Sequence, residues 1–336
     1  MFQSNAAILV PIFKFNSYFE STLNSILDSR PVSKVYLIID DDMDIPESFS
    51  AIQQDKYCLL KSPKSLSGVK GIGYKLDYAI RQINADFILR MDADDIWLPG
   101  REVEQLILLE KHAIVTSEPM LINSRGALIP DFRPRVPVGN IWEPLFLLCN
   151  PVSHPSVAIR RELLERVHGY RDTYPEDLDL WLRIINSDSQ IYVSDKPLIK
   201  YRRHRAQISV SSVSYSNSYS EVSEQYVILK NRLSIKSEIS QSSAFCRVQN
   251  CTNPVCNSNE YSKLVREIEA KIDGSKIVSK RYRKRLAYEA IIWFFLHKSI
   301  KKEMKSLLAI FGLKNLMVSL GCFFLQGTVF RIYGVK

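Results

Sequence analysis

The amino-acid sequence predicts an α/β protein in which helices flank a mostly parallel central sheet, followed by a basic, helical C-terminal extension. Short apolar runs alternate with segments of helical period over about the first ninety residues, a pattern typical of βαβ units. The 336 residues are 46% hydrophobic and 24% charged and contain no repeating low-complexity tract, which excludes fibrous and disordered classes. The net charge of +9 is uneven, at −2 over residues 1–210 and +11 over 211–336.

The first half of the sheet is predicted from four apolar runs, each of strand length. Helical-period segments at residues 18–27 and 76–83 separate some of these runs, so the connections suit parallel pairing. Carboxyl ends of parallel strands share one edge of the sheet, where ligands bind in such folds. The predicted strands cover residues 6–10, 35–39, 57–60 and 87–89.

Further elements follow with weaker periodicity. We expect helices near residues 103–109 and 176–185, a strand at 157–159, a last strand near 197–201, and a Pro-rich connection over 130–137. The Ser-rich stretch 209–220 marks a boundary. The sequence therefore predicts a domain over 1–210 and an extension over 211–336.

Acidic residues follow two of the predicted strands. Asp92 and Asp94 lie two residues apart at the end of one strand, and Asp40 ends another. Paired carboxylates repel each other unless a cation lies between them, and hard oxygen ligands favour Mg²⁺ or Mn²⁺. Aspartates are also ordinary turn residues after strands, so the pair alone is a weak signal.

These residues belong to a series of ordered motifs between residues 6 and 209. Taken together, the motifs resemble the inverting nucleotide-sugar glycosyltransferases of family 2, which have the Rossmann-like GT-A fold. The motifs are Val10-Pro11, Tyr18 with Glu20 and Ser25 to Leu27, Ile39 to Asp41, Arg90 to Asp95 with Leu98-Pro99 and Arg101, His154 to Ser156, Gly169-Tyr170, Glu176 to Arg183, and Tyr201-Arg202 with His204.

The resemblance implies a role for each half of the domain. Residues 1–100 would bind the nucleotide-sugar, expected to be a UDP-sugar, and 101–210 the acceptor. The implied donor-binding residues are Pro11, Glu20, Asp40, Asp41, Asp77, Arg90, Asp92 and Ala93. The implied ligands of Mn²⁺ or Mg²⁺ are Asp92, Asp94 and His204, and the implied acceptor-binding residues are His154, Trp181 and Arg183. The implied general base is Asp177, with Glu176 as the second choice.

Each role has a plainer alternative. Glu176 and Asp177 also suit the first turn of a helix, where acidic side chains are stabilising. His204 could belong to a solvated basic loop, His154 could be a structural histidine before Pro155, and Trp181 fits the apolar stripe of its helix. The chain also departs from the family pattern at positions that shape the nucleotide pocket: Lys14, Asp42, Met43 and Asp77.

The extension combines cations with apolar clusters. The basic run 280–285 precedes the apolar run 291–296, and apolar residues recur at near-helical spacing over 307–318. The apolar stretch 315–330 is shorter than the ~20 residues that span a bilayer. We therefore predict helices in the headgroup region of an anionic inner leaflet, with plain packing on the main body as the alternative. Nucleic acid is disfavoured because the aromatic residues cluster apart from the cations.

These features predict a cytoplasmic enzyme, peripherally associated with the inner face of the cell membrane, that glycosylates a glycan or lipid-linked acceptor in surface polysaccharide or lipopolysaccharide synthesis. No leader pattern is visible over residues 1–11. The rivals are a sugar nucleotidyltransferase, disfavoured because residues 11–14 lack a Gly-rich phosphate loop, and a non-catalytic glycan-binding protein at the membrane surface. A zinc site at Cys246, Cys251 and Cys256 is disfavoured by their wide spacing.

Overall fold

A computed structural model describes residues 5–29, 33–46, 57–63, 71–204, 207, 220–238, 258–272, 276–296 and 300–332. They group into two compact units. The first comprises the described residues of Met1–Met120 and Val152–Arg202; the second comprises those of Leu121–Pro151, Arg203–Ser216 and Ser220–Lys336. Cys246, Cys251, Cys256 and the boundary at residue 210 lie outside the described residues, so the division of domains at that position stays a prediction.

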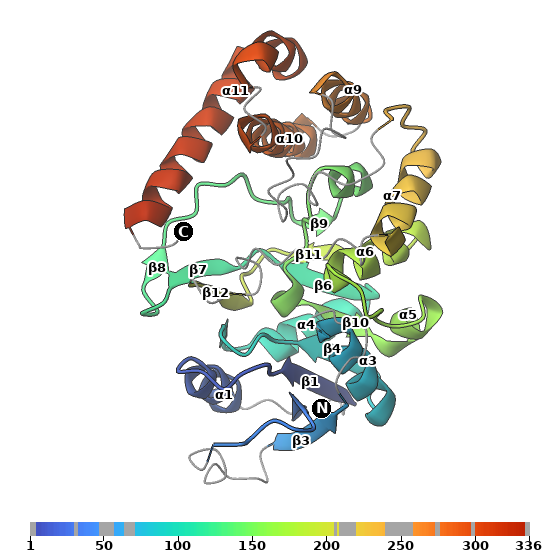
Figure 1. The fold of residues 1–336 in the computed structure, drawn as a ribbon, viewed down its shortest axis with the longest axis vertical. Helices are drawn as coiled ribbons and strands as arrows, with labels where there is room; N and C mark the ends of the chain where they lie inside the picture. The colour runs from blue at the N-terminus through green and yellow to red at the C-terminus, as the bar shows by residue number, and fades with distance from the viewer. Residues whose placement is uncertain are drawn as a thin grey trace. The chain divides into compact units, whose positions relative to one another are not determined.

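The first unit is built on a mixed sheet with the strand order β3-β2-β1-β4-β10-β6-β11 (Figure 1). The four strands predicted in the first ninety residues are its parallel part, with β1 between β2 and β4. The strands of this unit's sheet are β1 (Ala6–Pro11), β2 (Lys34–Asp40), β3 (Tyr57–Ser62), β4 (Phe87–Arg90), β6 (Ile114–Ser117), β10 (Ala158–Arg160) and β11 (Tyr192–Ser194).

The register places the predicted site residues at one edge. Pro11 pairs with Ile38 and Leu9 pairs with Arg90, so the carboxyl ends of β1, β2 and β4 lie side by side. All six residues of β1 are buried, as expected for a strand covered on both faces. The acids that follow β2 and β4 therefore share this edge.

Strand β10 was predicted, but its direction was not. It runs antiparallel to both β4 and β6, and β6 then pairs in parallel with β11. The sheet is therefore parallel only in part. The fold class itself, an α/β sheet flanked by helices with a helical C-terminal extension, is confirmed.

Helices cover the sheet of the first unit (Figure 1). Helix α3 contacts β1, β2 and β3, α4 contacts β6 and β10, and α5 contacts β10. Buried strand residues make up a core with the apolar residues of α1 and α4, and this core includes Ile8, Phe19 and Trp97. The bounds are α1 (Phe19–Asp28), α3 (Ile72–Gln82), α4 (Arg101–Leu109), α5 (Arg161–Arg166) and α6 (Glu176–Asn186), with a 3₁₀ turn η2 (His154–Ser156).

A short antiparallel pair lies beyond the carboxyl end of β4. Strand β5 (Ile96–Trp97) pairs with β12 (Ile199–Arg203), with Ile199 opposite Trp97. This pairing brings the distant residue Arg202 next to the acidic loop that joins β4 to β5. Neither β5 nor this pairing was predicted, because two-residue strands leave no periodicity to detect.

The second unit is mostly helical. Side chains of its long helices bind the Pro-rich segment predicted over 130–137: Arg285 donates to the Pro134 carbonyl oxygen, and Gln326 accepts from the Phe132 amide. The elements are β7 (Met120–Asn123), whose first residue counts with the first unit, β8 (Leu128–Ile129), β9 (Gly139–Asn140), the 3₁₀ turn η1 (Glu143–Leu147), α7 (Ser220–Arg232), α9 (Ser258–Glu269), α10 (Lys276–Leu296) and α11 (Ile300–Ile332).

Helix α11 corrects one expectation about the extension. The apolar stretch was predicted to be too short to span a bilayer, with Lys314 as its end. Helical residues instead lie on both sides of a break at Gly312 and include Lys314, and Leu307–Arg331 is a 25-residue segment long and apolar enough to cross a membrane. Length therefore does not exclude a span, although such a helix is weak evidence for one.

Candidate active site

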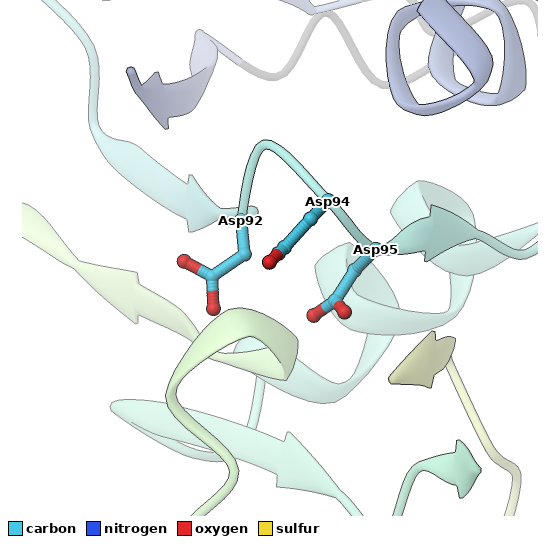
Figure 2. Close-up of side chains that lie close together, drawn as sticks. All are labelled: Asp92, Asp94 and Asp95. Carbon is cyan, nitrogen blue, oxygen red and sulfur yellow. The ribbon is translucent and has the colours of Figure 1, made fainter. Parts of the chain in front are cut away.

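The acidic loop after β4 gathers three carboxylates. One oxygen from each of Asp92, Asp94 and Asp95 lies within 4.8 Å of the others. Figure 2 shows the three side chains extending from a single loop toward one another. Asp92 and Asp94 are partly exposed, whereas Asp95 is fully buried. The sequence predicted the first two as ligands, and the structure adds Asp95 as a third carboxylate.

Three separate elements hold this loop in place. The Thr22 hydroxyl of α1 donates to the Asp95 carbonyl oxygen at 2.7 Å, and Arg202 of β12 donates from Nε to the Asp94 carbonyl oxygen at 2.7 Å. Arg101 of α4, which is fully buried, donates to the Arg90 carbonyl oxygen at 2.6 Å and lies 4.0 Å from the centre of the Trp97 ring. The position of the loop is thus fixed by the surrounding fold.

Burial and the closeness of the acids shift the pKa values of the groups in and around this loop. Burial raises the pKa of Asp92, the negative charge of Asp94 adds to this, and the Arg90 guanidinium that pairs with Asp92 opposes it. The pKa of Asp95 is raised well above its ordinary value, first by burial and then by Asp92 and Asp94. Burial also lowers the pKa of Arg101 to about 9.

The donor set fits a hard divalent cation. Asp95 Oδ1 accepts a hydrogen bond from the Arg202 amide at 2.8 Å, while Oδ2 is buried without a hydrogen-bond partner among the described residues. A buried carboxylate oxygen without a partner is costly, and a cation would satisfy it. Three carboxylates without sulfur or imidazole suit Mg²⁺ or Mn²⁺ better than Zn²⁺.

The predicted nucleotide-binding edge contains an ion pair that the sequence did not indicate. Lys75 Nζ of α3 lies 2.9 Å from Asp40 Oδ2 and donates to the Ile12 carbonyl oxygen at 2.9 Å. The ammonium group also lies 3.8 Å from the centre of the Phe13 ring, and the side chain is only 2% exposed. Lys75 therefore joins the carboxyl ends of β1 and β2.

The other predicted donor-binding residues lie at this edge or near it. Pro11 is buried at the end of β1, Asp41 follows β2 and is exposed, and Ala93 lies within the acidic loop. Glu20 is exposed in the first turn of α1, and Asp77 of α3 pairs with Arg81 at 2.6 Å. Their contacts with a nucleotide-sugar stay predictions.

A second polar cluster surrounds the start of α6. His154 Nε2 lies 2.9 Å from the Tyr170 hydroxyl, and His154 Nδ1 lies 3.6 Å from Glu176 Oε1. Burial lowers the pKa of His154 well below its ordinary value and raises that of Tyr170. Burial, with the charge of Asp177 next, raises the pKa of Glu176 to about 8; Arg90 and Asp92 also lie close enough to affect it.

Two residues predicted to bind the acceptor, Trp181 and Arg183, are buried. Trp181 is fully buried and its ring meets the His154 ring edge-on, with centroids 5.6 Å apart. Arg183 is buried, pairs with Asp179 at 2.7 Å and donates to the Val167 carbonyl oxygen. Both side chains stabilise α6, so a direct acceptor contact by either stays a prediction.

Two glycines let α3 approach this cluster. A Cβ atom on Gly73 would lie 2.0 Å from the Arg171 carbonyl oxygen and 3.1 Å from Glu176 Cβ. Gly169 has a φ of +67°, and a Cβ there would lie 2.1 Å from Asp77 Oδ1. The close contact of α3 with α6 and with the 169–171 segment therefore depends on the absence of these side chains.

Comparison with known proteins decides the family. Residues 7–167 match the sequence profile of glycosyl transferase family 2. This segment is a family 2 glycosyltransferase domain. The chain is 25% identical over 216 residues to the O-antigen biosynthesis glycosyltransferase WbnJ of Escherichia coli, across 62% of this chain and 84% of WbnJ. It is also 25% identical over 223 residues to the putative glycosyltransferase EpsE of Bacillus subtilis, across 62% of this chain and 77% of EpsE.

The fold has a counterpart among solved structures. The TarS fragment 1–349 of S. aureus, in complex with UDP-GlcNAc, superposes with a TM-score of 0.54 over 91% of this chain and 90% of that chain, at 14% identity. The family and the enzyme class expected from the sequence motifs are therefore confirmed. The rival predictions of a nucleotidyltransferase and of a non-catalytic protein are set aside.

In this glycosyltransferase, four of the predicted site residues lie near one another: Arg90, Asp92, His154 and Glu176. Asp92, Arg90 and Glu176 are electrostatically coupled, and His154 lies against Glu176. His204 comes directly after β12 and counts with the second unit, and its backbone amide donates to Gln207 Oε1 at 3.3 Å. Its role as a metal ligand stays a prediction. Sequence reasoning missed Lys75, Asp95 and Tyr170 as contributors; Asp95 was visible as the last acid of its motif.

Proposed function

We propose that this glycosyltransferase moves a sugar from a nucleotide diphosphate donor, in particular a UDP-sugar, to a hydroxyl group of a glycan or lipid-linked acceptor, with inversion of the anomeric configuration. The observation that supports the reaction is the three-carboxylate loop at the carboxyl edge of the sheet, electrostatically coupled to the acidic start of α6. TarS, a structural relative, binds UDP-GlcNAc and UDP, which favours a UDP-sugar.

Asp92, Asp94 and Asp95 would hold a Mn²⁺ or Mg²⁺ ion. When bound, that ion supplies Lewis-acid stabilisation of the negative charge that develops on the departing nucleotide diphosphate. The chain's own contribution is to hold the three carboxylates in place through Thr22 and Arg202. Arg90 pairs with Asp92 and opposes the effect of burial on the pKa of that side chain.

Asp177 is the proposed general base, ahead of Glu176. With its pKa raised to about 8, Glu176 is mostly protonated at neutral pH, so less of it is available to accept a proton from the acceptor hydroxyl group. Asp177 is partly exposed at the start of α6, and its Oδ1 accepts from the Leu178 amide at 2.8 Å. A protonated Glu176 would instead fix the position of this first turn through His154.

The acceptor is proposed to belong to surface polysaccharide or lipopolysaccharide synthesis at the inner face of the cell membrane. The relative WbnJ carries an O-antigen biosynthesis name, and AmsE of Erwinia amylovora, 29% identical over 140 residues, an amylovoran biosynthesis name. The charge of +11 over residues 211–336 favours association of the extension with an anionic leaflet. His154 is proposed to line the acceptor site, with Trp181 and Arg183 behind it.

Hydrolysis and transfer assays with Mn²⁺ test this proposal. Asp94→Ala and Asp177→Asn should each lose roughly 10²-fold or more of the turnover of UDP-sugar, whereas Asp28→Asn, at an exposed position at the end of α1, should keep it. Thermal melting with Mn²⁺ and UDP, GDP or dTDP separates the two roles. Asp177→Asn should keep the stabilisation by UDP and Mn²⁺, and Asp94→Ala should lose it. A larger stabilisation by GDP would refute the choice of donor.

A further inference from the structure

Helix α11 presents two different faces after a break at Gly312, whose φ of +71° and ψ of 159° are not helical. One face packs within the second unit. Leu316 and Ser319 are buried, as is Gln326. Helix α11 contacts α9 and α10 in this unit, and its red ribbon is the last helix of the chain in Figure 1. The segment after Gly312 therefore rests on the protein along one side.

Hydrogen bonds hold that side to its neighbours. The Ser319 hydroxyl donates to the Lys284 carbonyl oxygen at 3.1 Å. Gln326 Oε1 accepts from the Phe132 amide at 2.7 Å, and Gln326 Nε2 donates to the Pro130 carbonyl oxygen at 3.4 Å. A helix that left these neighbours to cross a bilayer would carry the Gln326 amide into hydrocarbon without these partners, which is unfavourable.

The opposite face is apolar and exposed. Leu313, Met317 and Phe324 are 66%, 60% and 59% exposed, and their spacing of i, i+4 and i+11 places them on one stripe of the helix. Val318 and Leu325, each one position after a stripe residue, are exposed as well and widen the apolar face. An apolar stripe of this length on the surface of a protein marks an interaction site.

The charged residues near the stripe indicate which kind of surface it binds. The sequence has no Asp or Glu from Met304 to its last residue, Lys336. Lys305, Lys314 and Arg331 are exposed on α11, and helical spacing places Lys314 and Arg331 on the same side as Leu313. An apolar stripe accompanied only by cations is complementary to a leaflet with anionic headgroups.

We propose that the α11 segment after Gly312 lies in the plane of an anionic leaflet, with Leu313, Met317 and Phe324 inserted among the acyl chains and Lys314 and Arg331 at the headgroups. The proposal rests on the membrane association in the proposed function and specifies the surface that makes it. The helix docks on the membrane while remaining packed on its own unit.

Flotation of the full-length protein with phosphatidylcholine vesicles, with and without phosphatidylglycerol, tests this surface. The triple variant Leu313→Ser, Met317→Ser, Phe324→Ser should bind anionic vesicles at least ~10-fold more weakly than the unmodified protein. The matched control is Val103→Ser, Ile107→Ser, Leu128→Ser, which changes three apolar residues that are 61%, 56% and 53% exposed on α4 and β8. This control should bind as the unmodified protein does.

Further readouts separate the possible outcomes. Hydrolysis of the UDP-sugar, measured without vesicles, should be equal in all three proteins, so a failure of the proposed chemistry appears there and not in flotation. Alkaline carbonate should release the vesicle-bound protein, because an in-plane helix does not cross the bilayer. Equal vesicle binding by the triple variant, retention after carbonate treatment, no binding by the unmodified protein, or a dimer that the triple substitution dissociates would each overturn the proposal.

Discussion

Replacing Glu176 by glutamine should stabilise the metal-free protein, increasingly so as the pH rises. The unfolded chain releases this proton near pH 4.5, and the folded chain near pH 8, because burial and the charge of Asp177 disfavour the carboxylate. Between these values the folded state binds a proton that the unfolded state lacks. The free energy of unfolding of the unmodified protein therefore falls by about 1.4 kcal/mol per pH unit over this range, or about 5 kcal/mol in all.

Thermal and urea unfolding between pH 5 and pH 9, with a chelator present, measure this difference. Glu176→Gln should resemble the unmodified protein at pH 5, gain stability relative to it up to about pH 8, and keep a constant advantage above that. Glu162→Gln, an exposed position paired with Arg166, is the control and should show no such trend. A constant difference between Glu176→Gln and the unmodified protein from pH 5 to pH 9 would show that Glu176 titrates near its ordinary value.

Three further predictions concern the groups that position the site. Lys75→Met leaves Asp40 beside an apolar chain and should lower the free energy of unfolding by about 3 kcal/mol in urea, against less than about 1 kcal/mol for the exposed pair member Lys196→Met; equal losses would contradict a structural role for the buried pair. Gly73→Ala should cost about 1–3 kcal/mol because its Cβ meets a backbone oxygen, whereas Gly321→Ala, with open space around it, should cost nothing; a stable Gly73→Ala would refute the close contact. Asp95→Asn should reduce the stabilisation by Mn²⁺ in thermal melts, and an unchanged shift would remove Asp95 from the ligand set.

Local signals in the sequence were sufficient for the parallel part of the sheet. The runs that became β1, β2, β3 and β4 are continuous and apolar, because a strand buried on both faces needs no polar alternation. The acids at the ends of these strands could be placed at one edge because the carboxyl ends of parallel strands lie together. Asp92 and Asp94 followed from this rule without any knowledge of their neighbours.

Contacts between distant segments left no such signal. Lys75 reaches Asp40 across 35 residues, and nothing in the helical period of α3 distinguishes it from a surface lysine. The antiparallel insertion of β10 depends on which strands pair, which a three-residue strand does not encode locally. Asp95 was seen as a motif member, but its full burial follows from Thr22 and Arg202, which lie on other elements.

The acidic loop has a consequence for how the enzyme would respond to its surroundings. Because burial raises the pKa values of Asp92 and Asp95, these carboxyl groups hold a proton to a higher pH than an ordinary aspartate does. A divalent ion must therefore displace this proton, and the affinity for the ion should increase with pH. Under the proposed function, a fall in the surrounding pH would weaken binding of the ion and slow sugar transfer without any change in the supply of donor.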